Sequence, residues 1–235
     1  MRLQFAYYLL FTSFISCYRP NTYGQDQGAI IIKRYLFEPG ITMNIDSKIL
    51  YKNRLSIQEV VELNTREDSS GKSFFTKVLF YTYLDPDKNL CYNYKSFSDT
   101  AKFINYYTNM DSTIINGGWN FYSNQKNFYD SLIDLKDTVI NRVEYKRIRV
   151  DNETKNKKIY SNIYFFRCDR VGLLVNFNKS LSDKIGCSVV RVDTWKENKL
   201  ITTVEILFLS DQLSKDEIKV FKAWENNAKG KPVNK

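Results

Sequence analysis

The N-terminal half of the chain alternates between short apolar stretches and polar turns, a pattern typical of β-strands. Apolar β-formers dominate 29–37, which ends at Pro39-Gly40, and they recur at 49–51 and 57–63. The stretch 73–84 (SFFTKVLFYTYL) and the stretch 90–94 flank the turn-forming residues 85–89. Because Pro86 presets a turn and cannot donate to a strand ladder, we predict a hairpin there.

The C-terminal half repeats this pattern. Strands are predicted at 139–150, 159–168, 171–177, 187–195 and 200–209, the last two joined by a tight turn at 196–198.

Helical spacing is confined to a few places. Phe128, Leu132 and Leu135 lie at i, i+4 and i+7 and predict a short helix. Residues 97–109 fit either a helix or a strand. Near the C-terminus, 214–217 (SKDE) is a capping box that starts a helix with an apolar stripe at Ile218, Phe221 and Trp224.

Together these elements predict an α+β, mostly β fold: a large curved antiparallel sheet, arranged as a meander, with a few short helices including a C-terminal one. Residues 28–235 form a single β-rich domain in this interpretation. The stretch 74–83 is apolar on both faces, so helices, sheet curvature or a ligand must cover one of them.

The first residues have the pattern of an export signal. Met1-Arg2 is followed by 14 apolar or uncharged residues (LQFAYYLLFTSFIS), which suits a signal peptide and falls short of the roughly 20 residues of a membrane span. The stretch ends at Cys17, after Ser16, and resembles a bacterial lipobox. We therefore expect 1–17 to be the signal, Cys17 to be lipidated and 18–27 to be a linker. Cleavage before Gln25 is the alternative.

Three cysteines remain beyond this signal: Cys91, Cys168 and Cys187. Export makes a disulfide feasible, and an odd count allows at most one within the domain. Cys168 and Cys187 are the candidate pair, because both end or begin predicted strands that a meander brings together. Three buried thiols are the other interpretation.

Composition excludes several chemistries. The chain has 235 residues and no histidine, which removes imidazole general bases and histidine-ligated metals. It contains no P-loop, no GxSxG and no CxxC. We expect no enzymatic activity, no cofactor and no metal site. The spacing Asp85-x-Asp87-x-Asn89 matches the start of a calcium loop, but Leu90 replaces its glycine, and a hairpin turn explains it better.

The net charge of +9 invites a nucleic-acid hypothesis. Basic residues cluster at 146–158, but Glu144, Asp151 and Glu153 dilute them. Since an exported protein does not ordinarily meet nucleic acid, we expect no nucleic-acid partner.

Part of the chain resembles known exported proteins. The segments 137–146 (DTVINRVEYK), 163–166 (IYFF) and 171–175 (VGLLV) are similar to the strand order of small bacterial envelope proteins of the GLPGLI type and of curved-sheet lipoprotein carriers of the LolA/LolB kind. The GLPGLI signature itself is absent, and no residue role carries over. The resemblance implies a half-open sheet that holds acyl chains or an apolar partner segment.

From this we expect a non-enzymatic lipoprotein of the bacterial cell envelope, at the outer membrane, in the periplasm or on the cell surface. Its partners would be the membrane, through the N-terminal lipid, and a lipid or protein bound on the sheet. A structural or assembly subunit of an envelope complex is the alternative.

Overall fold

The computed structural model describes residues 27–68, 71–107, 132–153, 159–170 and 177–229. Most of these residues lie in eleven strands, with a 3₁₀ turn, η1 (Cys168–Arg170), and two helices, α2 (Lys179–Ile185) and α3 (Lys215–Lys229). The strands are β1 (Gln27–Glu38), β2 (Ile41–Lys52), β3 (Leu55–Asp68), β4 (Gly71–Asp85), β5 (Leu90–Tyr94), β6 (Phe103–Tyr107), β7 (Ile133–Ile140), β8 (Val143–Glu153), β9 (Ile159–Arg167), β10 (Ser188–Lys196) and β11 (Lys199–Ser210).

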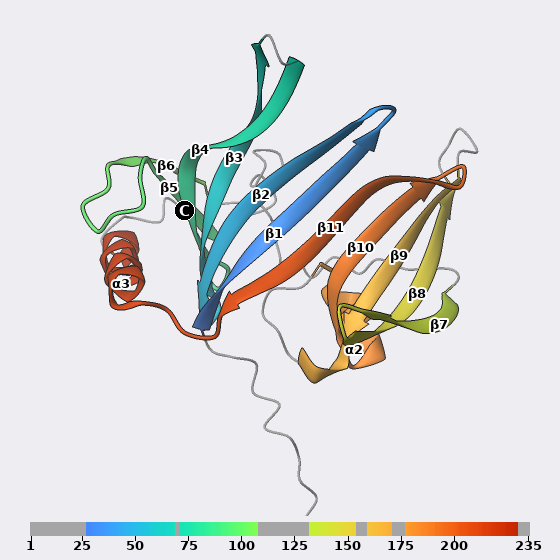
Figure 1. The fold of residues 1–235 in the computed structure, drawn as a ribbon. Coiled ribbons are helices and arrows are strands. Elements are labelled where there is room, and N and C mark those ends of the chain that lie inside the picture. The colour runs from blue at the N-terminus through green and yellow to red at the C-terminus, as the bar shows by residue number, and fades with distance from the viewer. Residues whose placement is uncertain (1–26, 69–70, 108–131, 154–158, 171–176, 230–235) are drawn as a thin grey trace, which may run out of the picture.

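All eleven strands belong to one sheet of order β6-β5-β4-β3-β2-β1-β11-β10-β9-β8-β7 (Figure 1). Except for β6 and β7, strands that are consecutive in sequence lie side by side, and the first strand pairs with the last, antiparallel. The sheet therefore consists of two meanders joined through β1 and β11, and its edges are the consecutive strands β6 and β7. The expected curved antiparallel meander with a C-terminal helix is confirmed.

Tight turns fix the register of these hairpins. Residues 39–40, 53–54, 141–142 and 197–198 each separate paired strands. Asn141 and Arg142 both have positive φ (52° and 66°), as do Glu197 and Asn198 (50° and 62°). Two such residues in succession are typical of two-residue hairpin turns, whose twist matches that of the strands they join.

The central strands bury apolar side chains on both faces, because a different part of the molecule covers each face. Ala29 on β1 packs in a core with Leu50, Ile57 and residues of α3 such as Trp224. The alternate residues Ile30 and Ile32 lie in a second core with Ile49 and Ile206. A third core joins Ile148, Phe166 and Val189 to Leu181 of α2. Figure 1 shows α3 beside β3–β5 and α2 beside β8–β10.

The structure corrects the sequence analysis between 132 and 150. The spacing of Leu132 and Leu135 predicts a helix, but Ile133–Ile140 is strand β7, paired with β8. The predicted strand 139–150 is interrupted at Asn141-Arg142, where the chain reverses. Long-range pairing overrides the local helical period here. The described residues do not include Phe128. They also leave out 171–176, which is most of the predicted strand 171–177.

Two further elements clarify or extend the prediction. The ambiguous segment 97–109 contains strand β6 at Phe103–Tyr107. Helix α2 was not expected from the sequence. Its first turn is capped by Asn178, whose side chain accepts a hydrogen bond from the Leu181 amide at 2.9 Å, and it ends at Gly186 with φ 74°.

Candidate functional site

The most prominent irregularity of the sheet is the place where β2 and β3 separate. Their register runs only from Ile49 opposite Gln58 to Lys52 opposite Leu55, whereas β1–β2 and β3–β4 pair along almost their whole length. Beyond this point the hairpins β1–β2 and β3–β4 diverge (Figure 1). We call this opening the fork.

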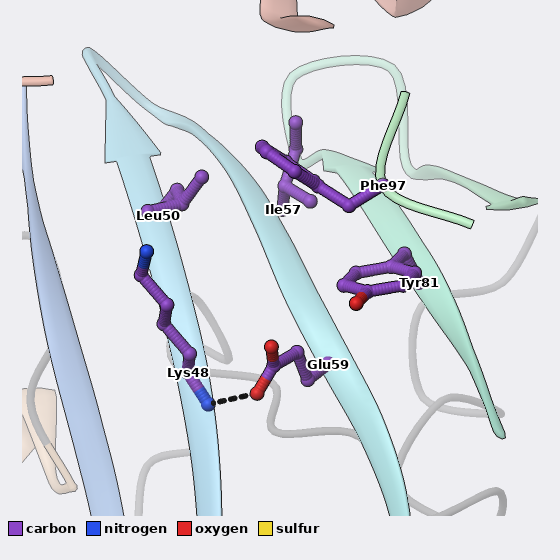
Figure 2. Close-up of a pocket in the computed structure, with 6 residues that line it drawn as sticks. All are labelled: Lys48, Leu50, Ile57, Glu59, Tyr81 and Phe97. Atoms are coloured by element: carbon purple, nitrogen blue, oxygen red, sulfur yellow. Dashed lines mark hydrogen bonds between the residues drawn. The ribbon is translucent and has the colours of Figure 1, made fainter. Parts of the chain in front are cut away.

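Side chains end the ladder at the base of the fork. The Lys48 amide donates to the Glu59 carboxylate at 2.8 Å, which is the dashed line in Figure 2. The Ser47 hydroxyl donates to the Glu59 carbonyl at 2.6 Å. Because side chains bond the Lys48 amide and the Glu59 carbonyl, β2 and β3 can separate there without leaving these two backbone groups unpaired.

A pocket of about 70 Å³ lies at the base of the fork. Figure 2 shows side chains from β2, β3, β4 and the segment after β5 around it. Leu50, Ile57 and Phe97 supply apolar surface, while Lys48, Glu59 and Tyr81 supply polar groups. Pockets for drug-sized ligands measure roughly 300–1,000 Å³. The volume here suits one small apolar side chain rather than an acyl chain.

Helix α3 begins beside this pocket. Lys48 Nζ lies 2.9 Å from Glu217 Oε1, and the capping box is present as predicted: Glu217 accepts from the Ser214 amide at 2.8 Å, and Ser214 Oγ accepts from the Glu217 amide at 3.3 Å. Burial alone would raise the pKa of Glu217, but the hydrogen bonds from Lys48 and Ser214 outweigh it, so the pKa is lowered.

Aromatic packing holds α3 and the pocket together. The Trp224 ring stacks on Tyr94 with centroids 4.0 Å apart, and Trp224 Nε1 donates to the Ser98 carbonyl at 2.9 Å. Phe97 contacts both Trp224 and Tyr81, with centroids 6.1 and 5.6 Å away. The predicted stripe residues Phe221 and Trp224 are buried. The wall of the pocket is thus connected to the main contact of the C-terminal helix.

The tyrosines of this region are poor candidates for acid–base chemistry. Burial raises the pKa of Tyr94 to about 12 and raises the pKa of Tyr81 and Tyr83 as well. These phenols stay neutral near pH 7 and act as packing surface.

A second, larger pocket of about 460 Å³ lies near the β7–β8 turn and η1. Its lining is charged, with cations at Arg142, Lys146 and Arg167 balanced by Asp137, Glu144 and Asp169. Arg167 is already hydrogen-bonded to Asp169. Because the two signs are balanced, this pocket has no strong field that would select an anion or a cation.

The candidate residues of the sequence analysis are scattered. Cys168 and Cys187 form a disulfide with Cα atoms 4.4 Å apart, between the end of β9 and the start of β10. Cys91 is a buried free thiol whose pKa burial raises to about 12. Cys17 lies outside the described residues. None of the cysteines that the structure describes lines the fork pocket.

The polar motifs have local explanations. Asp85 accepts from Lys88 Nζ at 2.6 Å and Asp87 pairs with Arg54, so the predicted turn is stabilised by ion pairs. In the basic cluster, Arg147 donates to the Lys136 carbonyl and Arg149 donates to Asp151. Within the described ranges, no group of three or more acidic or cysteine residues could hold a metal ion.

No helix in the part of the chain that the structure describes is long and apolar enough to cross a membrane. No protein-family model matches the chain, and no curated protein matches it either.

Sequence reasoning missed the fork pocket. Lys48 and Glu59 looked like ordinary polar positions of half-exposed strands, and Phe97 belonged to an ambiguous segment. Only the strand register brings them together, and no local motif signals where a ladder ends.

Proposed function

We propose that this chain is an exported lipoprotein of the bacterial cell envelope that, without catalysing a reaction, binds an apolar side chain of a partner polypeptide at the fork. The observation that carries the proposal is the pocket of Lys48, Leu50, Ile57, Glu59, Tyr81 and Phe97, with apolar surface inside and polar groups around it. Such a pocket can anchor one apolar side chain while its polar groups orient the backbone around it.

Two observations support export and attachment to a membrane. The first 17 residues have the charge and length of a signal peptide and end at a cysteine. The disulfide between Cys168 and Cys187 suits an oxidising compartment. A lipid on Cys17 would hold the domain at the membrane surface, since two or more acyl chains together give stable anchoring.

A non-catalytic role is supported by the state of the polar groups at the fork. Lys48 is paired with Glu217, and the Glu59 carboxylate accepts a backbone hydrogen bond. Tyr81 is kept protonated by its raised pKa. The polar groups around the fork pocket are therefore already engaged in structural contacts or held neutral, which favours a role in binding.

The anchor is tested by the mass of the mature N-terminus from a native preparation. An acylated Cys17 is expected, whereas a free N-terminus at Gln25 would remove the lipoprotein proposal.

The binding site is tested by photo-cross-linking of the full chain in cells. A photoreactive phenylalanine analogue replaces Phe97, and Tyr160, at the far end of the sheet, serves as the matched control position. We expect one polypeptide adduct at position 97, absent at position 160 and reduced when Leu50→Phe narrows the pocket. A lipid adduct, or adducts that Leu50→Phe does not change, would contradict binding of a polypeptide side chain.

A structural or assembly role is the second candidate. It is favoured by the apolar side chains Phe75, Val78 and Leu79 on β4, which are 48%, 37% and 45% exposed. Single exposed apolar residues are common, but three within five positions of one strand are typical of a contact surface.

A further inference from the structure

The outer part of the β3–β4 hairpin extends beyond the rest of the sheet. A bulge at Leu79 interrupts the register between Val60–Phe80 and Val61–Val78, and bulges bend a strand pair and increase its twist. Beyond it, Val61–Asp68 pairs only with Gly71–Val78 among the described strands. We call Val61–Asp68 together with Gly71–Leu79 the arm. Figure 1 shows it projecting from the sheet.

The arm has both edges open. β2 pairs with β3 only as far as Gln58, and β5 pairs with β4 only from Tyr81 onward, so no described strand lies along either side of it. A two-stranded ribbon is marginally stable in water, and open strand edges are templates for pairing with another chain. The exposed apolar residues Phe75, Val78 and Leu79 lie on this same ribbon.

We propose that the arm pairs with the arm of a second copy of this chain, through an antiparallel contact between the two β3 strands centred on Asn64. This inference rests on the open strand edges of the arm and of the fork, and it does not depend on export.

Strand directions favour a second copy as the occupant of the fork. β2 and β3 run antiparallel, so a single inserted strand would be parallel to one of them, whereas two antiparallel strands fit both. A partner's arm supplies such a pair. With a two-fold axis at the β3–β3 contact, the order becomes β2, partner β4, partner β3, β3, β4, partner β2. Every adjacent pair is then antiparallel, and all the open edges of both arms and of β2 are paired.

Charge fixes the register. Side chains on one face of a strand recur every two residues, so Glu62, Asn64 and Arg66 share a face. When Asn64 lies opposite its own copy, Glu62 of each chain lies opposite Arg66 of the other. Opposite charges directly across a strand pair are stabilising, and like charges are destabilising. The symmetric contact therefore contains two such ion pairs.

The length of the arm is compatible with this register. With Asn64 at the centre, Asp68 of one copy lies opposite Val60 of the other. The end of each arm then reaches the base of the partner's fork, where the side chains of Ser47 and Glu59 end the β2–β3 ladder. A shift of several residues would leave part of the fork unfilled or drive the arm into its base.

Cysteine cross-linking of the full chain in its native membrane tests the register. Opposed residues of antiparallel strands have Cα atoms about 4.5–5.5 Å apart, within the range of a disulfide. We expect Asn64→Cys to give a covalent dimer without reductant. The matched control Glu67→Cys should not, because the two copies of residue 67 would lie roughly 20 Å apart. A dimer with Glu67→Cys and none with Asn64→Cys would overturn the proposal.

Charge exchange tests the contact without a new cysteine. In detergent-extracted full chain, Glu62→Arg and Arg66→Glu should each weaken dimerisation roughly 2- to 30-fold, as two symmetric pairs change sign. The double variant should restore it, and Glu144→Arg on β8, an exposed position of the other meander, should have no effect. A monomeric wild type, or a double variant as weak as the single ones, would refute the proposal. Neither result would affect the fork pocket, whose own test is the adduct at position 97.

Discussion

Removing the indole of Trp224 should separate the C-terminal helix from the sheet. Trp224 is fully buried, stacks on Tyr94 and donates to the Ser98 carbonyl at 2.9 Å. Truncating a buried aromatic side chain to alanine costs about 3–5 kcal/mol, and a stacked aromatic pair accounts for about 0.5–1.5 kcal/mol beyond its buried area. We expect Trp224→Ala to lose about 4 kcal/mol, a large part of the total stability of a typical domain, which is about 5–15 kcal/mol.

A second substitution separates packing from hydrogen bonding. Trp224→Phe keeps a ring against Tyr94 but removes the donor to Ser98, whose carbonyl still accepts a hydrogen bond from the Ala101 amide at 3.1 Å. We expect a loss of about 1–2 kcal/mol for this variant. The control is Lys222→Ala on the exposed side of α3, which should stay within about 0.5 kcal/mol of wild type.

Urea unfolding followed by far-ultraviolet circular dichroism measures all three variants, and hydrogen exchange of the α3 amides shows whether the helix opens separately. A loss below about 1 kcal/mol for Trp224→Ala, or equal losses for the alanine and phenylalanine variants, would show that the aromatic contact does not fix the helix.

Three further predictions concern titration and cysteines. The pKa of Glu217 is lowered from its ordinary value of 4.5, so its carboxylate stabilises the fold above that pH. This contribution is lost as the pH falls through the lowered pKa. Glu217→Gln should therefore make the free energy of unfolding, measured by urea titration, depend less on pH below about pH 5. Replacing Cys168 and Cys187 with serine removes a cross-link over 19 residues and should lower the free energy of unfolding by about 3 kcal/mol. The thermal midpoint of this variant should be lower than that of the wild type, and adding a reductant should lower only the midpoint of the wild type. With its pKa raised to about 12, Cys91 should react with iodoacetamide at pH 8 more than about 100-fold slower in the native protein than in urea, and equal rates would contradict its burial.

Alternation and turn chemistry were sufficient to predict most of the sheet. Pro39-Gly40 and the residues 85–89 mark reversals by their backbone preferences, and strands β1, β4, β5, β10 and β11 lie close to their predicted positions. The Asn141-Arg142 turn was missed because β-forming residues lie directly on both sides of it, Val139-Ile140 before and Val143 after, so that 139–150 resembles one continuous strand. Helix α2 has a local signal in Asn178 and Gly186, which are its caps, but its seven residues are too few for a clear helical period.

The candidate site was not predictable in the same way. The fork exists because the β2–β3 ladder stops after four residue pairs, and that stop depends on Ser47, Lys48 and Glu59 meeting across two strands. The arm depends on a bulge at Leu79 that no local motif marks. Such features follow from register, which is set by the whole hydrophobic pattern and the turns rather than by any short segment.

The two proposals together restrict how the molecule can lie on a membrane. From Cys17 to Gln27 the chain spans at most about 36 Å. In the proposed dimer the two β3 strands run antiparallel about Asn64, so their starting ends, where each chain enters the sheet beside Leu55, lie roughly 60 Å apart. Two lipids in one membrane can reach both ends only if the strands are inclined by less than about 40° to its plane. A fluorophore at residue 67 should therefore lie within about 36 Å of the membrane in the dimer, as measured by energy transfer to labelled lipid headgroups. Glu62→Arg, which weakens the dimer and favours a monomer free to stand upright, should increase the mean distance.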